Sequence, residues 1–186
     1  LKLEALQTVE QLVGRFHNQP IYHIGHLIVM LTVPVIMISL TSFMNVLQGT
    51  GKKLGFWGGI IGLFGAFILA VDKGALCLTL SALDTVPENE FVKMMPGLLA
   101  MFNKEGWLIL IWGLVLLPIG FTIQTVGLLK SRSLATWQSI LFLIGVLFIG
   151  TPDGVEILNL SAAILMAIAL VPYGIKLIKQ KNYTGV

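Results

Sequence analysis

Six ionisable side chains fall at one predicted level of this chain, and they are its best candidates for chemistry. Two histidines three residues apart open the first long apolar run, and in a helix they share one face. A neighbouring acid and base stand near the end of the second run, and two acids flank the break between the last two runs. We expect all six to line one shared mouth at the outer side of the protein: His23, His26, Asp72, Lys73, Asp153 and Glu156.

Metal binding is the first chemistry that this mouth allows. Imidazole and carboxylate groups are ligands of zinc and other divalent ions, so His23 and His26 are a candidate metal pair. The sequence supplies no recognised third ligand for the pair, and solvated or helix-capping histidines are the more ordinary interpretation. Haem held by two histidines needs ligands from two helices, whereas the three histidines of this chain fall within ten residues of one another. Cofactors are therefore unknown from the sequence, and none is assigned.

Covalent and acid–base catalysis find little support in the sequence. An aspartic protease needs two facing carboxylates that share a proton, but Asp72 and Asp153 are expected at the membrane edge, and Lys73 adjoins the first of them. The single cysteine, Cys77, excludes a C-x-x-C thiol relay, and no G-x-S-x-G motif is present. We assign no catalytic residue and expect the aspartates to cap or end helices at the water boundary.

A second set of polar residues is expected inside the predicted membrane region, toward its inner face: Thr41, Asn45, Gln124 and Thr125. Intramembrane hydroxyls and amides usually bond to a neighbouring helix or to their own backbone. The functional alternative is a polar path or ligand pocket between two halves of the protein. Acidic and basic residues are absent from the depth of every apolar run, which argues against a proton-coupled pump or a voltage sensor.

The elements that must position these residues are five apolar runs. A helix that crosses a bilayer needs about 20 apolar residues. Of the 186 residues, 56% are hydrophobic and 11% are charged, against about 25% charged in soluble domains. The sequence predicts an all-α, polytopic integral membrane protein with five transmembrane helices, forming a single membrane domain over residues 1–186. The expected spans are about 21–47, 54–71 with helix extending to 83, 107–129, 134–150 and 155–175.

The charges between the runs sort by sign. Basic residues without any acid follow the first, third and fifth runs, and all nine acids lie on the other side. Because basic residues near span ends are retained in the cytoplasm, we predict an inner or plasma membrane protein with its N-terminus outside and its C-terminus cytoplasmic. The expected partners are the lipid bilayer, and other membrane subunits or a second copy; nucleic acid is not expected. The basic residues that follow the first, third and fifth runs are Lys52, Lys53, Lys130, Arg132, Lys176, Lys179 and Lys181.

Two flanking segments complete the predicted architecture. Residues 1–18 carry apolar side chains at helical spacing between charged ones, which predicts an amphipathic helix that lies in the outer interface or binds a partner. Residues 84–106 are expected to form the largest outer loop, with a short, proline-broken apolar piece that is interfacial or re-entrant.

Small residues suggest how the helices pack. Four glycines in the second run, Gly55, Gly58, Gly59 and Gly62, form small-x-x-x-small pairs that let two helix backbones approach. We expect tight packing inside the bundle, with a homodimer seam as the alternative. The chain also matches itself at an offset of 80 residues, as where Trp57 meets Trp137. This match predicts a parallel two-fold repeat in which spans 1–2 are equivalent to spans 3–4.

Three functions are consistent with this pattern. The first is a non-enzymatic accessory, assembly or interaction subunit of a membrane. The second is a small transporter or channel with a ligand site between the repeat halves, which needs a cavity that reaches the middle of the membrane. The third is a metal-binding or enzymatic site at the outer mouth, which needs His23, His26 and one of the acids within reach of one atom.

Overall fold

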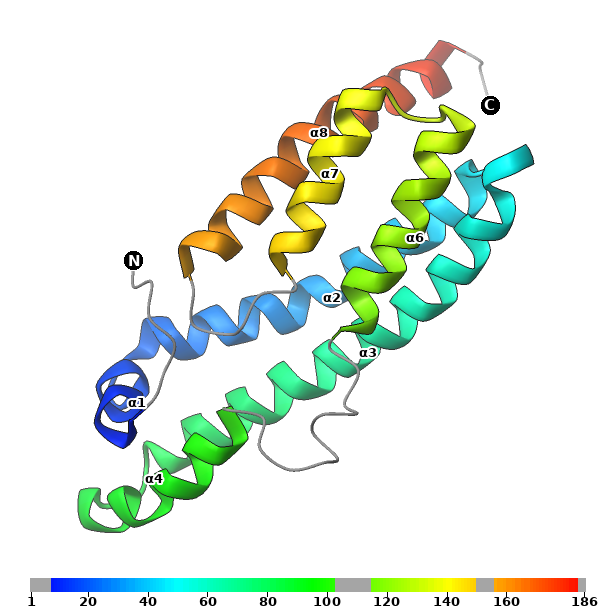
Figure 1. Ribbon diagram of the computed structural model, residues 1–186. Helices are drawn as coiled ribbons and strands as arrows, with labels where there is room; N and C mark the ends of the chain where they lie inside the picture. The colour runs from blue at the N-terminus through cyan, green and yellow to red at the C-terminus, as the bar shows by residue number, and fades with distance from the viewer. Residues whose placement is uncertain (1–7, 103–114, 150–155, 184–186) are drawn as a thin grey trace.

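The computed structural model describes residues 8–102, 115–149 and 156–183, and regular structure in these ranges is entirely helical (Figure 1). They contain seven α-helices, one 3-10 turn and no strand. The all-α prediction is therefore confirmed. The elements in chain order are α1 (Val9–Phe16), α2 (Pro20–Val46), η1 (Gly49–Gly51), α3 (Lys52–Leu83), α4 (Glu88–Phe102), α6 (Leu116–Ser131), α7 (Thr136–Ile149) and α8 (Glu156–Tyr183).

Two of these helices, α2 and α3, are long and apolar enough to cross a membrane by length and composition. Three shorter apolar helical stretches lie in α6, α7 and α8. The observed bounds of α2 and α3 agree with the predicted 21–47 and 54–83 within two residues. The predicted third span is described only from residue 115, and the fifth helix continues to Tyr183, beyond the predicted limit of 175.

Local sequence signals fix the ends of α2. Asn18 adopts a left-handed conformation, with φ of 54°, which turns the chain after α1, and Pro20 then occupies the first helical position. Asparagine tolerates positive φ better than most residues, and proline is pre-organised for a first turn. After α2, Gly49 has φ of 56° and leads through η1 into α3, so that α2 and α3 run antiparallel side by side (Figure 1).

The predicted outer loop over 84–106 is wrong for most of its length, because residues 88–102 form the helix α4. Pro96 lies inside this helix rather than breaking it. Phe91, Met95 and Leu98 recur at helical spacing, and all three are buried against Leu80 near the end of α3. Burial of this row outweighs the backbone hydrogen bond that a proline inside a helix removes.

Helix α1 packs on α4 and completes a small second core. Thr8 and Gln11 form a capping box at its start, and Val9 and Val13 pack on the buried cluster of α3 and α4. Hydrogen bonds from its own backbone N–H and from the Thr8 hydroxyl lower the pKa of Glu10. The predicted amphipathic helix is thus confirmed over Val9–Phe16, and residues 1–7 lie outside the described part. We name α1, α4 and the last turns of α3 the cap.

The larger core lies in the bundle formed by α2, α3, α6, α7 and α8. Helix α3 packs along both α2 and α6, α6 also contacts α7, and α7 packs along α8 (Figure 1). The core includes Leu40 and Phe43 of α2, Ala66 of α3, Phe121 of α6 and Phe142 of α7. The predicted equivalence of spans 1–2 and 3–4 stays a prediction.

The helix ends group at two opposite ends of the molecule. The start of α3, the end of α6, the start of α7 and the end of α8 lie together, and the cap lies at the opposite end (Figure 1). The basic residues of these helix ends and of the turn between α6 and α7 therefore share one end. They are Lys52, Lys53, Lys130, Arg132, Lys176, Lys179 and Lys181.

Candidate functional site

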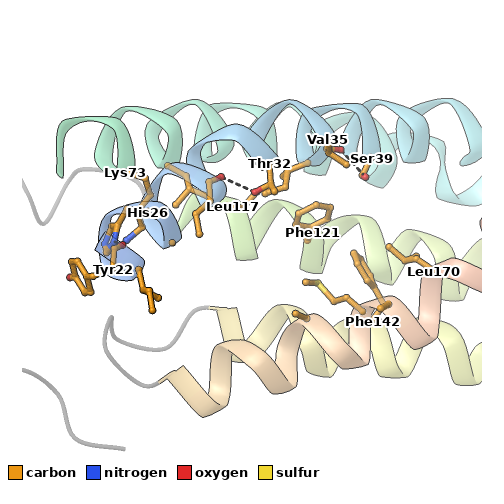
Figure 2. A pocket seen from close by; sticks show the side chains of 18 of the residues that line it. Tyr22, His26, Thr32, Val35, Ser39, Lys73, Leu117, Phe121, Phe142 and Leu170 are labelled. Carbon is orange, nitrogen blue, oxygen red and sulfur yellow. Dashed lines mark hydrogen bonds between the residues drawn. The ribbon is translucent and has the colours of Figure 1, made fainter. Parts of the chain in front are cut away.

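A cavity of about 1070 Å³ lies between α2 and α8, with further walls from α3, α6 and α7 (Figure 2). On α2 its lining begins at Gln19, just before the helix, and reaches Ser39. At 1.5 Å per residue this distance is about 30 Å, comparable to the apolar thickness of a bilayer. The cavity is therefore long enough to hold an extended molecule along the bundle axis.

One end of the cavity is polar. Tyr22, His26 and Lys73 lie together at the end nearest the cap, as Figure 2 shows. His26 Nδ1 is 3.1 Å from the Tyr22 carbonyl oxygen. A carbonyl only accepts, so this nitrogen carries the proton and donates. Lys73 Nζ lies 3.4 Å from Asp72 Oδ2, and both side chains are mostly buried. A cationic group thus stands beside an imidazole at the mouth.

The body of the cavity is apolar. Its far end is lined by Phe121 of α6, Phe142 of α7 and Leu170 of α8 (Figure 2). The two hydroxyls along α2 are turned to their own helix, because Thr32 donates to the Val29 carbonyl at 2.7 Å and Ser39 to the Val35 carbonyl at 2.9 Å. Such local bonds satisfy a hydroxyl without a ligand. The body therefore offers mainly apolar surface.

Small residues widen the cavity on both sides. Gly25 lies on the α2 wall, and Ala163 and Ala167 lie four residues apart on the α8 wall. A Cβ placed on Gly25 would meet no other atom within 4 Å. This part of α2 consequently faces open space rather than another helix backbone.

A second polar cluster fixes the segment that leads to the polar end. His17 Nδ1 donates to Asp84 Oδ1 at 3.0 Å, and His23 Nε2 donates to Asp84 Oδ2 at 2.6 Å. The ring of His17 also lies 4.4 Å from the ring of Phe91. One carboxylate at the end of α3 thus bridges both sides of the turn between α1 and α2. We name these three residues, His17, Asp84 and His23, the clasp.

The clasp was not predicted from the sequence, because Asp84 was expected in a loop and His17 had no assigned role. One signal was available. The turn at Asn18 brings the histidines on either side of it together, and the length of α3 carries Asp84 to the same level. The pairing itself needs the tertiary packing of α3 beside α2.

The structure separates the members of the predicted mouth. His23 joins the clasp, whereas His26 and Lys73 line the cavity, with Asp72 beside the lysine. Asp153 lies outside the described residues, and Glu156 begins α8 without a described side chain. Within the described residues, no group of three or more histidine, cysteine or acidic side chains is placed to hold a metal ion.

The predicted intramembrane polar residues divide into buried and exposed ones. Gln124 is fully buried, and its amide donates to the carbonyls of Leu40 (2.9 Å) and Gly55 (3.1 Å), so it ties α6 to α2 and α3. Thr125 is buried and donates to its own helix at 2.7 Å. Thr41 also bonds only within its helix and is exposed, like Asn45, whose carbonyl accepts from the Gln48 amide.

The predicted glycine row lies between helices of the same chain. Gly58 faces the backbone of Gly120 in α6, and a Cβ on Gly58 would lie 2.7 Å from the Gly120 carbonyl oxygen. Gly59 and Gly62 face Met44 and Leu40 of α2, and Gly55 is covered by Leu47. Since α2 and α6 cover this row, a second copy of the chain would have to dock on another surface. We name the contact of α3 with α6 the glycine seam.

Comparison of the chain with known protein families, with curated proteins and with solved structures found no match. A function for this chain must therefore be inferred from the geometry of the cavity, the clasp and the glycine seam.

Proposed function

We propose that the chain is an integral membrane protein whose five apolar helices cross the bilayer, with the cap and the N-terminus outside and the basic end in the cytoplasm. The apolar outer surface supports this. Only 17% of the most apolar window of α2 and 33% of that of α3 are buried inside the protein. Large side chains such as Leu31, Phe64 and Ile164 are more than half exposed. Soluble proteins rarely expose continuous apolar surface on this scale.

The orientation follows from the grouping of basic residues at one end and is tested by labelling in cells. In a Cys77→Ala background, cysteine is placed at Glu88 in the cap or at Lys52 at the basic end. We expect an impermeant maleimide to label Glu88→Cys on intact cells and Lys52→Cys only after permeabilisation. The reverse pattern would overturn the orientation, and release of the protein from membranes without detergent would overturn membrane insertion.

Within this frame we propose that the protein acts without catalysis and binds an amphipathic molecule of the bilayer in the cavity between α2 and α8. The observation that best supports this proposal is the division of the cavity into a polar end at Lys73 and His26 and a long apolar body. A transporter or carrier with a ligand site among its helices would have such a cavity. Ligand sites of this kind are typically apolar with a few convergent polar groups.

Photocrosslinking tests this function. The probe is a diacylglycerol that carries its photoreactive group on an acyl chain, added to the protein in mild detergent. We expect crosslinks to map to cavity residues of α2 and α8. Gly25→Phe should abolish them by filling the cavity, because its new side chain enters open space there. Gly174→Phe is the matched control, since Gly174 also faces open space but does not line the cavity. Crosslinks spread over all exposed helix faces, or unchanged in Gly25→Phe, would exclude binding in the cavity.

A second candidate, an accessory or interaction subunit, is favoured by the outer surface of the cap. The surface of α4 that flanks its buried face exposes Val92 on one side and Met94 and Met101 on the other, to between 43% and 49%. A partner subunit, or the membrane interface, could cover these apolar side chains. Val92→Glu together with Met94→Glu should then disperse a complex seen in mild detergent, as measured by light scattering. If the unaltered chain is monomeric there and binds no other subunit, this role is excluded.

A further inference from the structure

We infer that the molecule bound in the cavity is a lipid with a phosphate in its headgroup, with the phosphate at Lys73 and the acyl chains along the apolar body. This inference rests on the proposed function and deepens it, because it names the chemistry that selects the ligand. It is carried by the position of the lysine relative to the cavity, the charges around it and the length of the apolar body.

Lys73 is the charged residue that reaches the cavity. Among the described residues that line the cavity, it is the one permanent charge, and it stands beside His26. Asp72, one position earlier on α3, pairs with Lys73 but does not line the cavity. An anionic group entering this end therefore meets the ammonium before it meets the carboxylate.

The ion pair of Lys73 with Asp72 is one with which a phosphate can compete. A lysine ammonium has three donors, and the pair with Asp72 Oδ2 at 3.4 Å is long for a charge-assisted hydrogen bond. The side chain of Lys73 is 12% exposed, so its charge is weakly screened. A phosphate oxygen with full or partial charge gains more here than a neutral hydroxyl, and lysine binds phosphate as a compact point charge. His26 adds a second polar group at the same end.

The apolar body selects a lipid rather than a free phosphate. From Lys73 the lining continues through Leu69 and Leu117 to Phe142 and Leu170, deep in the bundle. Water in a passage of this composition would find few hydrogen-bond partners, because the hydroxyls of Thr32 and Ser39 already bond to their own helix. Acyl chains replace that water with apolar contact and hold the headgroup at the polar end.

The test compares two probes that differ only in the phosphate. Photoreactive phosphatidic acid and photoreactive diacylglycerol with the same acyl chains are titrated against the protein in mild detergent. We expect half-maximal crosslinking at about tenfold lower concentration for phosphatidic acid, because hydrogen bonds to charged groups are stronger than neutral ones. Inorganic phosphate at millimolar concentration should not compete. Effective competition by inorganic phosphate would show that the site takes the free anion and would overturn the lipid proposal.

Variants assign the preference to the lysine. Lys73→Met should bring the two probes to equal affinity, whereas Lys73→Arg should keep a preference for phosphatidic acid. Lys93→Met is the matched control, because Lys93 also pairs with a nearby acid, Glu90 at 2.9 Å, but lies on α4 away from the cavity. If Lys73→Met does not fold, because Asp72 is left half-buried without its cation, the double variant Asp72→Asn with Lys73→Met removes both charges and gives the same readout.

The outcomes separate the two proposals. Equal binding of both lipids to the unaltered protein overturns the phosphate inference and leaves the proposed function in place. Absence of cavity crosslinks with either lipid overturns the proposed function itself. A preference for phosphatidic acid that persists in Lys73→Met but is lost in Lys93→Met moves the anion site to the cap and also overturns the inference.

Discussion

The glycine seam and the cavity are two contrasting regions of one bundle. Both contain small residues four positions apart, Gly58 and Gly62 on α3 and Ala163 and Ala167 on α8. At the seam, the backbone of Gly120 in α6 lies so close that an added Cβ on Gly58 would be 2.7 Å from its carbonyl oxygen. At the cavity, the facing helix stands away and leaves about 1070 Å³. The same residue pattern therefore permits either backbone contact or an open site.

The neighbouring side chains explain the difference in part. Around the seam, the small residues of α3 oppose a glycine of α6, so that neither helix holds the other away. In the cavity, the wall formed by α2 includes the branched side chains of Val35 and Ile36 as well as Gly25. Bulky side chains on one wall keep the facing helix away even where small residues are present, whereas small residues that face each other directly allow backbone contact.

The largest change in the free energy of unfolding is expected from a substitution at the glycine seam. Gly120→Ala places a Cβ 2.6 Å from the Gly58 carbonyl oxygen, and it should lower the free energy of unfolding by about 3 kcal/mol as the two backbones separate. Gly25→Ala at the cavity meets no atom within 4 Å and should raise it by about 0.5–1 kcal/mol, because alanine loses less backbone entropy. Unfolding in mild detergent measures both variants. Similar effects of both substitutions would contradict the contrast between the regions.

Substitution of two alanines, one in the core and one in the cavity, tests the same difference between a packed region and an open one. Ala66 is fully buried in the core on α3, and Ala66→Leu should cost about 2 kcal/mol of stability through overpacking. Ala167 lines the cavity and is exposed, so Ala167→Leu should stay within about 0.5 kcal/mol of the unaltered protein. Denaturation curves of the two variants and the unaltered protein measure these changes in stability. A loss at Ala167 as large as that at Ala66 would mean that the space beside α8 is already filled.

Replacement of a buried glutamine should lower the free energy of unfolding by a smaller amount. Gln124→Leu removes the two hydrogen bonds that join α6 to α2 and α3, and it should cost about 1–2 kcal/mol. Gln138→Leu is the control in the wall of α7, where a single bond of 3.0 Å to the Ala169 carbonyl joins α8, and about half that cost is expected. If Gln124→Leu leaves the unfolding midpoint unchanged, the amide does not hold the seam, and a role in a polar path becomes the better explanation.

The smallest effect is expected at the clasp. Asp84→Asn removes the carboxylate that bridges His17 and His23, so the cavity-lining segment between them should loosen by about 1 kcal/mol or less while the seam stays unchanged. Hydrogen exchange of residues 17–23 compared with α6 measures this. Glu90→Gln, which breaks an exposed pair with Lys93, serves as control and should change little. Faster exchange in α6 as well would show that the clasp supports the whole bundle.

Much of the secondary structure was predictable, because its causes are local. Apolar runs of sufficient length gave α2 and α3 nearly to the residue, and Pro20 marks the start of α2. The helix α4 was not predicted, since Pro96 argued for a break and the burial that stabilises it comes from α3. The spacing of Phe91, Met95 and Leu98 was the signal that would have indicated a helix there.

Of the residues that line the cavity, the sequence predicted only two polar members. His26 and Lys73 were expected near one another and both line the cavity, but His23 turns to the clasp. Helical spacing places His23 and His26 on one face, yet it does not say which neighbour each will meet. That depends on Asp84, which lies 61 residues away from His23.

The sequence alone determined where the apolar helices lie and which helix ends carry basic residues, because both properties depend on runs of neighbouring residues. Tertiary structure decided which small residues meet a backbone, which line a cavity, and which acid pairs with the histidines. These outcomes depend on how far apart two helix axes run, and that separation is set by side chains on both helices at once. A one-dimensional pattern records only one side of each such contact.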